Sequence, residues 1–296
     1  GMQTREEDVV TKLFLSSNHS YLLYFTDMGR VYRTKTYNIP EAGRTAKGTP
    51  VVNIIEKSPE EKISEIIPVK EFSDNEYLVM VTKNGVIKKT PASEYESIRK
   101  SGKIAITLKE GDELISIFKT TGNDNIFLAT RNGMAICFNE NDARAVGRTA
   151  SGVKAIDLAD GDYVVGAEPV REDSKVLLVT DGGYGKCTDL TSFRIQHRGG
   201  KGLKAYKITE KTGNIIGISM VNDSEELIMV TSEGVVIRIR IKDIATTTGR
   251  ITQGVRLINL NDGVIVVSMD KISAEDTVEE ESEENNTEVT AETTEE

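Results

Sequence analysis

The chain has 296 residues, of which 38% are hydrophobic and only 5% aromatic, with no Trp. Such a core must be built from Val, Ile and Leu, which suit strands better than helices. No apolar run approaches the roughly 20 residues of a membrane span, and no basic segment followed by an apolar one opens the chain. Two cysteines without a CxxC motif and two distant histidines predict buried, reduced Cys137 and Cys187, no metal site, and a cytoplasmic protein.

The net charge of −10 is concentrated at the end of the chain. Residues 274–296 hold 11 acidic side chains and no Lys or Arg, and without them 36 acidic side chains face 37 basic ones. We therefore expect a tag remnant and leader over 1–7, a folded domain over 8–271, and a disordered acidic tail over 272–296. The tail either aids solubility or competes as a polyanion for a basic surface of the same chain.

In chain order, the first recurring pattern is an apolar strand that ends in Thr, followed by two variable residues and Gly. Its threonines are separated by 56, 48, 50 and 51 residues, and they are Thr26, Thr82, Thr130, Thr180 and Thr231. A spacing of about 50 residues indicates five structural repeats.

Two further strands are predicted in each repeat. One opens at a second glycine (Gly48, Gly102, Gly152, Gly202 or Gly254), in the segments GTPVVNI, GKIAITL, GVKAIDL, GLKAYKI and GVRLINL. The other covers 65–69, 114–118, 163–167, 215–219 and 264–268, mostly after Gly-Asp, Gly-Asn or Asp-Gly pairs typical of hairpin turns. Segments 91–100 and 189–198 are expected to be loops. Roughly four strands in each of five repeats predict an all-β, propeller-like ring, with an open solenoid as the structural alternative.

Basic residues recur just before the second glycine. An Arg lies four residues before it in four repeats, and Arg99 with Lys100 takes this place in the remaining one. Equivalent loops should project from the same side of each blade and form a curved cationic track that suits the phosphates of duplex DNA. No segment resembles a base-reading element, so we expect recognition of backbone and shape. The predicted DNA-binding residues are Arg33, Lys35, Arg44, Lys47, Lys88, Lys89, Arg99, Lys100, Lys103, Arg148, Lys154, Lys186, Arg198, Lys201, Lys204, Arg238, Arg250 and Arg256.

One heptad in these loops carries a family resemblance. Gln196-His197-Arg198-Gly199-Gly200-Lys201-Gly202 resembles the Gln-Arg-Arg-Gly-Gly-Lys-Gly box of the C-terminal DNA-wrapping domain of bacterial DNA gyrase A, with His197 in place of an Arg. Segments 30–35, 39–41, 44–48, 85–90 and 111–115 also look like that domain. The resemblance covers about residues 6–270 and the acidic tail.

This resemblance implies a β-pinwheel, in which neighbouring blades exchange a strand, that wraps DNA around its rim. It implies a non-catalytic, monomeric, nucleoid-associated domain whose partners are double-stranded DNA, the remainder of the gyrase A protein and the gyrase B protein. ATP and Mg²⁺ are then used by the holoenzyme, and no cofactor or catalytic residue is assigned to this chain. The family usually has six blades and carries the box in the first, whereas this chain shows five repeats and carries the heptad in the fourth. The alternatives are the related domain of topoisomerase IV, a propeller that binds proteins and, least favoured, an enzyme with its site at the centre of the ring.

Overall fold

The structure, a computed structural model, describes residues 16–42 and 46–272. Strands dominate this part, and its helical segments are single 3-10 turns. The strands are β1 (Tyr21–Thr26), β2 (Arg30–Lys35), β3 (Ile63–Val69), β4 (Tyr77–Thr82), β5 (Val86–Pro91), β6 (Lys103–Ile104), β7 (Leu114–Thr120), β8 (Asn125–Thr130), β9 (Met134–Asn139), β10 (Val153–Lys154), β11 (Val164–Pro169), β12 (Lys175–Thr180), β13 (Tyr184–Asp189), β14 (Leu203–Lys204), β15 (Ile215–Val221), β16 (Glu226–Thr231), β17 (Val236–Arg240), β18 (Thr246–Thr247), β19 (Val255–Arg256) and β20 (Val266–Ile272). The 3-10 turns are Thr36–Asn38, Val51–Asn53, Ala92–Tyr95, Glu140–Asp142, Leu190–Ser192 and Ile241–Asp243.

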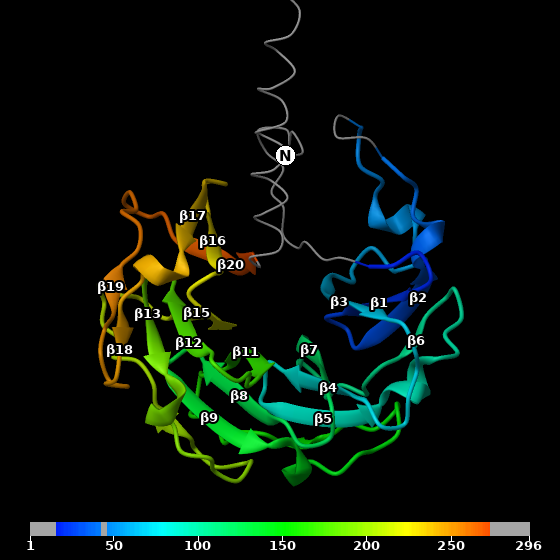
Figure 1. Cartoon of the computed structure of the whole chain (residues 1–296), viewed down its shortest axis with the longest axis horizontal. Helices are drawn as coiled ribbons and strands as arrows, with labels where there is room; N and C mark the ends of the chain where they lie inside the picture. The colour runs from blue at the N-terminus through cyan, green and yellow to red at the C-terminus, as the bar shows by residue number, and fades with distance from the viewer. Residues whose placement is uncertain (1–15, 43–45, 273–296) are drawn as a thin grey trace, which may run out of the picture.

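The strands form five small sheets, one for each predicted repeat, which confirms the all-β, propeller-like fold. In order along the chain the sheets read β3-β1-β2-β6, β10-β5-β4-β7, β11-β8-β9-β14, β15-β12-β13-β18 with β19 also on β13, and β17-β16-β20. Figure 1 shows these blades side by side on an arc, with β3, β7, β11, β15 and β20 on its inner side. Neighbouring inner strands contact one another, so the arc has a common centre.

The Thr-x-x-Gly pattern closes the hairpin at the heart of each blade. In every repeat the glycine has a positive φ, between 76° and 84°, and its amide donates to the carbonyl oxygen of the threonine. The threonine hydroxyl accepts the amide of the residue after the glycine, as in Arg30 N to Thr26 Oγ1 at 3.3 Å and Met134 N to Thr130 Oγ1 at 3.2 Å. All five threonines are buried, so the hydroxyl satisfies a backbone donor that solvent does not reach. Only glycine adopts the required turn conformation without strain.

The segments that open at the second glycine do not complete their own blade. The two-residue strands β6, β10, β14 and β19 pair with β2, β5, β9 and β13 of the preceding blade. The amides of Ala105, Ala155, Ala205 and Leu257 then donate to the carbonyl oxygen of the turn glycine of that same preceding blade. The two glycine signatures of the sequence therefore meet across repeats, and each of the first four blades is completed by its neighbour.

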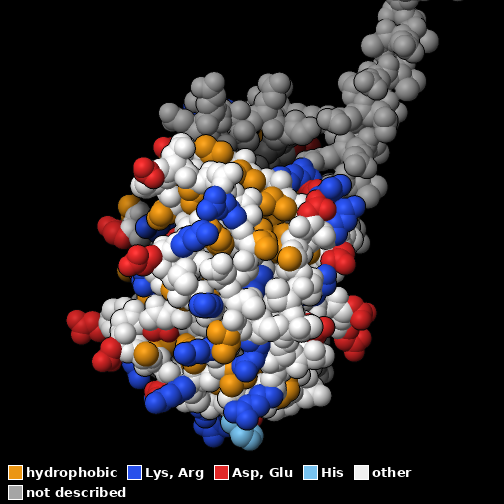
Figure 2. Space-filling view, turned by 90° about the vertical axis from the view of Figure 1, so that its left-hand side faces the viewer, with side chains coloured by type: hydrophobic (Ala, Val, Ile, Leu, Met, Phe, Trp, Pro, Cys, Tyr) orange, Lys and Arg blue, Asp and Glu red, His pale blue; other side chains and the backbone are white. Residues whose placement is uncertain are grey.

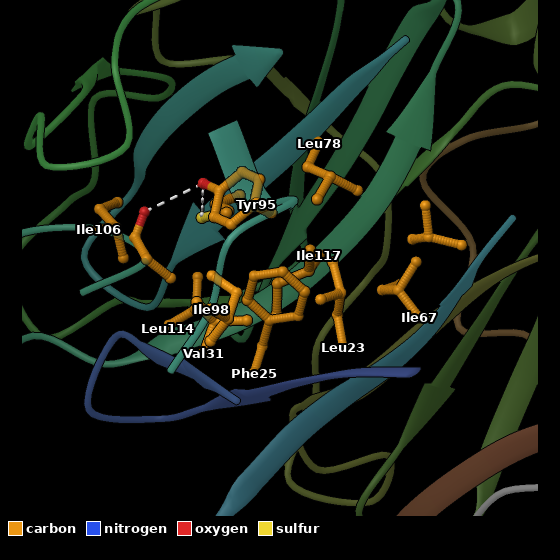
Figure 3. Packing of buried hydrophobic residues seen from close by; sticks show 13 residues of the cluster. Leu23, Phe25, Val31, Ile67, Leu78, Tyr95, Ile98, Ile106, Leu114 and Ile117 are labelled. Carbon is orange, nitrogen blue, oxygen red and sulfur yellow. Dashed lines mark hydrogen bonds between the residues drawn. The ribbon is translucent and has the colours of Figure 1, made fainter. Parts of the chain in front are cut away.

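Apolar side chains from neighbouring blades share a core. Figure 3 shows the cluster between the first two blades, where Leu23 and Phe25 of β1 pack against Leu78 of β4 and Ile117 of β7. Equivalent clusters join the second blade to the third, the third to the fourth and the fourth to the fifth. Each inner blade is thus covered on both faces, which explains why both alternating sets of strand residues are buried there.

The first and fifth blades depart from this scheme. The first segment, GTPVVNI, was predicted to be a strand, but the structure has a 3-10 turn at Val51–Asn53 and no strand there. Val51 and Ile54 pack instead against Leu22 and Tyr24, on the face of β1 opposite the second blade. In the described residues β17 has no partner on its outer side, and nothing lies within 4 Å of the Cβ position of Gly234.

The third strand of each repeat lies close to its predicted position. The expected strands at 65–69, 114–118 and 215–219 lie within β3, β7 and β15, whereas β11 and β20 begin one and two residues later than expected. Cys137 and Cys187 are buried free thiols, as predicted. The leader over 1–7 and the start of the domain at residue 8 lie outside the described residues, as does all of the acidic tail but residue 272. Among the described helical segments, none is long and apolar enough to cross a membrane.

Candidate nucleic-acid interface

The exchanged strands and the loops before them form a continuous outer layer on the arc. From one repeat to the next, the backbone of this layer is joined by hydrogen bonds. Thr107 N donates to Ala150 O at 3.2 Å, Asp157 N to Gly200 O at 2.9 Å, and Lys207 N to Thr252 O at 3.0 Å. The basic loops of the third, fourth and fifth repeats are therefore laid side by side in chain order. We call this layer, residues 99–108, 144–158, 194–208 and 249–260, the rim.

Glycines allow the rim to lie this close to the blades. A Cβ on Gly152 would lie 2.5 Å from Ile87 O, and one on Gly202 would lie 2.4 Å from Ala135 O. A Cβ on Gly254 would lie 2.4 Å from Gly185 O. These contacts are shorter than real Cβ contacts, so each position excludes any other residue unless the exchanged strand moves. The second glycine signature is thus a requirement of strand exchange.

Most of the predicted cations are accessible. Nine are exposed, namely Lys35, Lys47, Arg99, Lys100, Lys154, Lys201, Lys204, Arg238 and Arg256, and five are half-buried, namely Arg33, Lys103, Arg148, Arg198 and Arg250. Figure 2 shows one side of the arc, on which Lys and Arg side chains follow the middle of the surface. Asp and Glu side chains lie mostly at its two lateral margins. The charges are therefore sorted, with the cations between two flanking acidic zones.

Several of these cations are also bonded within the protein. The Arg256 guanidinium donates to Tyr184 Oη at 3.0 Å and to Asn259 Oδ1 at 3.0 Å. The hydrogen bond from Arg256 to Tyr184 lowers the pKa of the Tyr184 hydroxyl from its ordinary value. Lys154 forms an ion pair with Asp157 at 3.0 Å. Such surface pairs are weak and open readily, so both cations remain available to an anionic partner.

The box-like heptad of the fourth repeat lies on the rim against the third blade, beside the exchanged strand β10. The Arg198 guanidinium joins the fourth repeat to the third there, with Nε donating to Asp142 O at 2.8 Å and Nη1 to Lys154 O at 3.0 Å. Gly199 N donates to Ala155 O at 2.6 Å, and Gly199 has a φ of +83°. His197 is almost fully exposed, with Nδ1 lying 3.2 Å from Asp142 Oδ2. Arg198 and the glycines of the heptad thus build the loop, while the neighbouring Lys201 is exposed to solvent.

Three predicted DNA-binding lysines do not lie on the surface, which corrects the expectation that they face a ligand. Lys88, Lys89 and Lys186 have exposed fractions of 1%, 5% and 0%. Lys89 Nζ lies 3.3 Å from Glu140 Oε2 of the next blade, and it also lies over the ring of Tyr77. The inner blades are covered on both faces, so a strand lysine has no free side to occupy. Arg44 lies outside the described residues.

Other predicted cations lie away from the rim. Arg33 and Lys35 lie on β2 of the first blade, near the ring of Tyr21. Arg238 lies on β17 and forms an ion pair with Glu226 of β16. Lys47 lies in the exposed segment of the first repeat, beside which the described residues place no preceding blade.

Two arginines of the rim were not among the predicted DNA-binding residues. Arg144 and Arg194 are exposed, and each lies four residues before a predicted arginine of the same loop, Arg148 or Arg198. This second spacing occurs only in the third and fourth repeats, so it is not part of the pattern that all five repeats share. In the described residues, no group of three or more His, Cys, Asp or Glu side chains is placed to hold a metal ion.

The fold and the rim define a propeller-like domain whose blades exchange strands and carry a cationic outer edge. The family model described as "DNA gyrase C-terminal domain, beta-propeller" matches residues 20–70, 76–121, 124–171, 174–222 and 225–273, one match for each blade. The chain belongs to this family.

Relatives and solved structures agree with this assignment. The DNA gyrase A protein of Clostridium acetobutylicum is 50% identical over 275 residues, which cover 93% of this chain and 33% of the relative. The DNA gyrase A protein of Halalkalibacterium halodurans is 54% identical over 276 residues, with the same coverage of both chains. The chain therefore spans about a third of the length of these curated relatives.

Among solved structures, a crystal structure of the C-terminal domain of DNA topoisomerase IV is similar with a TM-score of 0.83 and 28% identity, covering 92% of this chain and 84% of that one. A structure of the DNA gyrase A C-terminal domain has a TM-score of 0.74 at 24% identity, covering 86% of this chain and 83% of that one, and shows the shared fold.

Proposed function

We propose that this domain binds duplex DNA along its rim without sequence specificity and bends it around the arc. The observation that carries the proposal is the continuity of the rim, which lays the basic loops of successive repeats side by side between acidic margins. Binding a cationic track to phosphates releases counterions, which favours association at low salt. Smooth bending of a short duplex costs on the order of 1–6 kcal/mol, which several phosphate contacts can offset.

Membership of the DNA gyrase C-terminal domain family supports a role for this DNA binding in supercoiling. In our proposal the domain acts within DNA gyrase, together with the remainder of the gyrase A protein and with the gyrase B protein. It holds a DNA segment in a curved path so that the holoenzyme, which hydrolyses ATP, can introduce negative supercoils. The domain itself takes no part in the chemistry.

A related candidate is the equivalent role in topoisomerase IV, because a C-terminal domain of that enzyme is similar in structure. We favour gyrase, because the relatives at 50% and 54% identity are both gyrase A proteins. Supercoiling and decatenation assays of the holoenzyme that contains this domain distinguish the two enzymes. Supercoiling of relaxed plasmid supports gyrase, and decatenation without supercoiling supports topoisomerase IV.

The test is a titration of the domain with an unrelated-sequence duplex of about 40 bp from low to moderate salt. One phosphate contact from each rim loop of repeats two to five predicts a slope of about −3.6 in log affinity against log salt concentration. A second duplex of scrambled sequence should bind equally well, and dyes at the two duplex ends should approach each other when the DNA bends. Absence of binding at low salt would refute the proposal and favour a protein-binding propeller.

A further inference from the structure

Two of the buried lysines occupy equivalent places in alternate blades. Lys88 and Lys186 each lie three residues after the turn glycine, in the second and fourth blades. Their exposed fractions are 1% and 0%, so neither ammonium group can contact an external phosphate directly. Both nevertheless lie directly beneath the rim.

Each ammonium group is bonded to the basic loop that crosses from the next repeat. Lys88 Nζ donates to the carbonyl oxygen of Arg148 and to that of Ala105. Lys186 Nζ donates to the carbonyl oxygen of Arg250 and to Thr252 Oγ1 at 3.1 Å. In both blades the acceptor is the main chain of the arginine that recurs four residues before the second glycine.

The third blade achieves the same attachment in a different way. Ile136 takes the place equivalent to Lys88 and Lys186 there, and it offers no hydrogen bond. The loop of the fourth repeat is tied down instead by the Arg198 guanidinium, which donates to Asp142 O and Lys154 O. Attachment of the arginine-bearing loop to the preceding blade is thus common to the three, whether the donor comes from below or from the loop.

A buried ammonium is costly, and packing alone does not require one. Removing a charged group from water costs several kcal/mol unless hydrogen bonds replace the lost hydration. Ile136 shows that an apolar side chain fills the equivalent place. At Lys88 the cost is raised further, because the Arg148 guanidinium repels the ammonium, and attraction by the Glu94 carboxylate opposes this repulsion. The function of the lysine must therefore lie in what it holds.

We propose that Lys88 and Lys186 are positioning residues for DNA binding, which fix the main chain at Arg148 and Arg250 so that these arginines are presented on the rim. This inference rests on the proposed function. Fixing the loop before DNA arrives removes part of the ordering entropy that binding would otherwise cost. The two lysines act from beneath the interface, and neither touches DNA.

The experiment compares Lys88→Met with Lys109→Met in the domain, using the 40 bp duplex at about 0.1 M salt. Both changes replace a lysine with methionine, but Lys109 is an exposed residue outside the rim. One phosphate contact makes binding about eightfold tighter at 0.1 M salt than at 1 M salt. We therefore expect Lys88→Met, which displaces one such contact, to weaken binding roughly five- to tenfold. Lys109→Met should stay within about twofold of the wild type.

A double-mutant cycle separates positioning from general destabilisation. Lys88→Met combined with Arg148→Ala should bind no more weakly than Arg148→Ala alone, because both remove the same contact. Lys88→Met combined with Arg250→Ala should multiply the two losses, because the sites lie in different blades. Unchanged affinity of folded Lys88→Met, or losses that multiply equally in both cycles, would overturn the inference. If Lys88→Met does not fold, the cycle of Lys186→Met with Arg250→Ala makes the same test in the fourth blade.

Amide hydrogen exchange separates failure of this inference from failure of the proposed function. Lys88→Met should speed exchange at Val146 and Ala150, whose amides bond within and beneath the loop, while the loop over 196–202 keeps its wild-type rate. This result is expected whether or not the domain binds DNA. Faster exchange in a domain without DNA affinity would preserve the loop attachment and reject the DNA-binding role of both proposals. Unchanged exchange would reject the attachment itself.

Discussion

The dependence of strand exchange on glycine can be measured with a matched pair of substitutions, Gly202→Ala and Gly161→Ala. Both glycines have a φ of +75°, so both alanines incur the same left-handed conformational cost of roughly 1–2 kcal/mol. They differ in their surroundings. A Cβ on Gly202 would lie 2.4 Å from Ala135 O, whereas nothing lies within 4 Å of the Cβ position of Gly161.

The extra cost at Gly202 follows from what β14 holds. To relieve the contact, β14 must move away from β9, which weakens the hydrogen bonds of Ala205 N at 2.8 Å and Tyr206 N at 3.2 Å to Gly133 O. At about 1 kcal/mol for each bond, together with partial exposure of the buried Tyr206 ring, we expect an additional loss of about 2–4 kcal/mol.

Urea unfolding followed by circular dichroism at 25 °C measures both free energies of unfolding. The difference between the two variants isolates the steric contact, because the backbone cost is common to both. A difference below about 0.5 kcal/mol would show that strand exchange does not require glycine at position 202. Gly202→Ala should also weaken DNA binding, since the same residue ends the box-like heptad.

Three further outcomes are expected. Lys201→Ala should lessen the salt slope of DNA binding by about 0.9 at unchanged stability. Arg198→Ala should also lower the free energy of unfolding by about 2 kcal/mol, because it removes two hydrogen bonds between repeats. Salt titration and urea unfolding check the pair, and equal effects of the two substitutions would contradict the prediction. Burial lowers the pKa of Lys88 to about 7, with repulsion from Arg148, and burial lowers the pKa of Lys186 to about 8. DNA affinity should therefore fall as the pH rises from 6.5 to 9. Methionine at both positions should make the affinity independent of pH over this range in binding titrations. A wild-type affinity that does not change with pH would show that these lysines have no such effect. Over the range above these pKa values stability should rise with pH in urea unfolding, because the unfolded chain keeps protons that the folded chain releases. Glu140→Ala should lower the free energy of unfolding by about 3 kcal/mol or more, because it strands a buried ammonium, and a loss below 1 kcal/mol would show that the ion pair is dispensable.

The sequence by itself determined the repeat, its phase and the chemistry of its turns. The Thr-x-x-Gly hairpins and the buried cysteines could be predicted because the information is local: a hydroxyl reaches an amide four residues away, and glycine alone tolerates the positive φ. The recurrence of Arg before the second glycine likewise identified the loops that form the rim. The extent of the strands that open at the second glycine was predicted wrongly, because β6, β10, β14 and β19 have only two residues each and not the whole of their seven-residue segments.

Only the tertiary structure decided which blade each strand completes and which way the lysines face. The pairing of β14 with β9 joins residues about 70 positions apart, and nothing local distinguishes it from pairing within the repeat. Lys88 and Lys89 point to opposite faces of β5, yet both are buried because blades pack on either side. In the inner blades, alternation along a strand therefore does not predict which side chains are exposed, whereas β17 of the fifth blade still alternates. The segment at Val51–Asn53 has the same pattern as the exchanged strands, but no preceding blade lies beside it in the described residues, and it folds against the first blade instead.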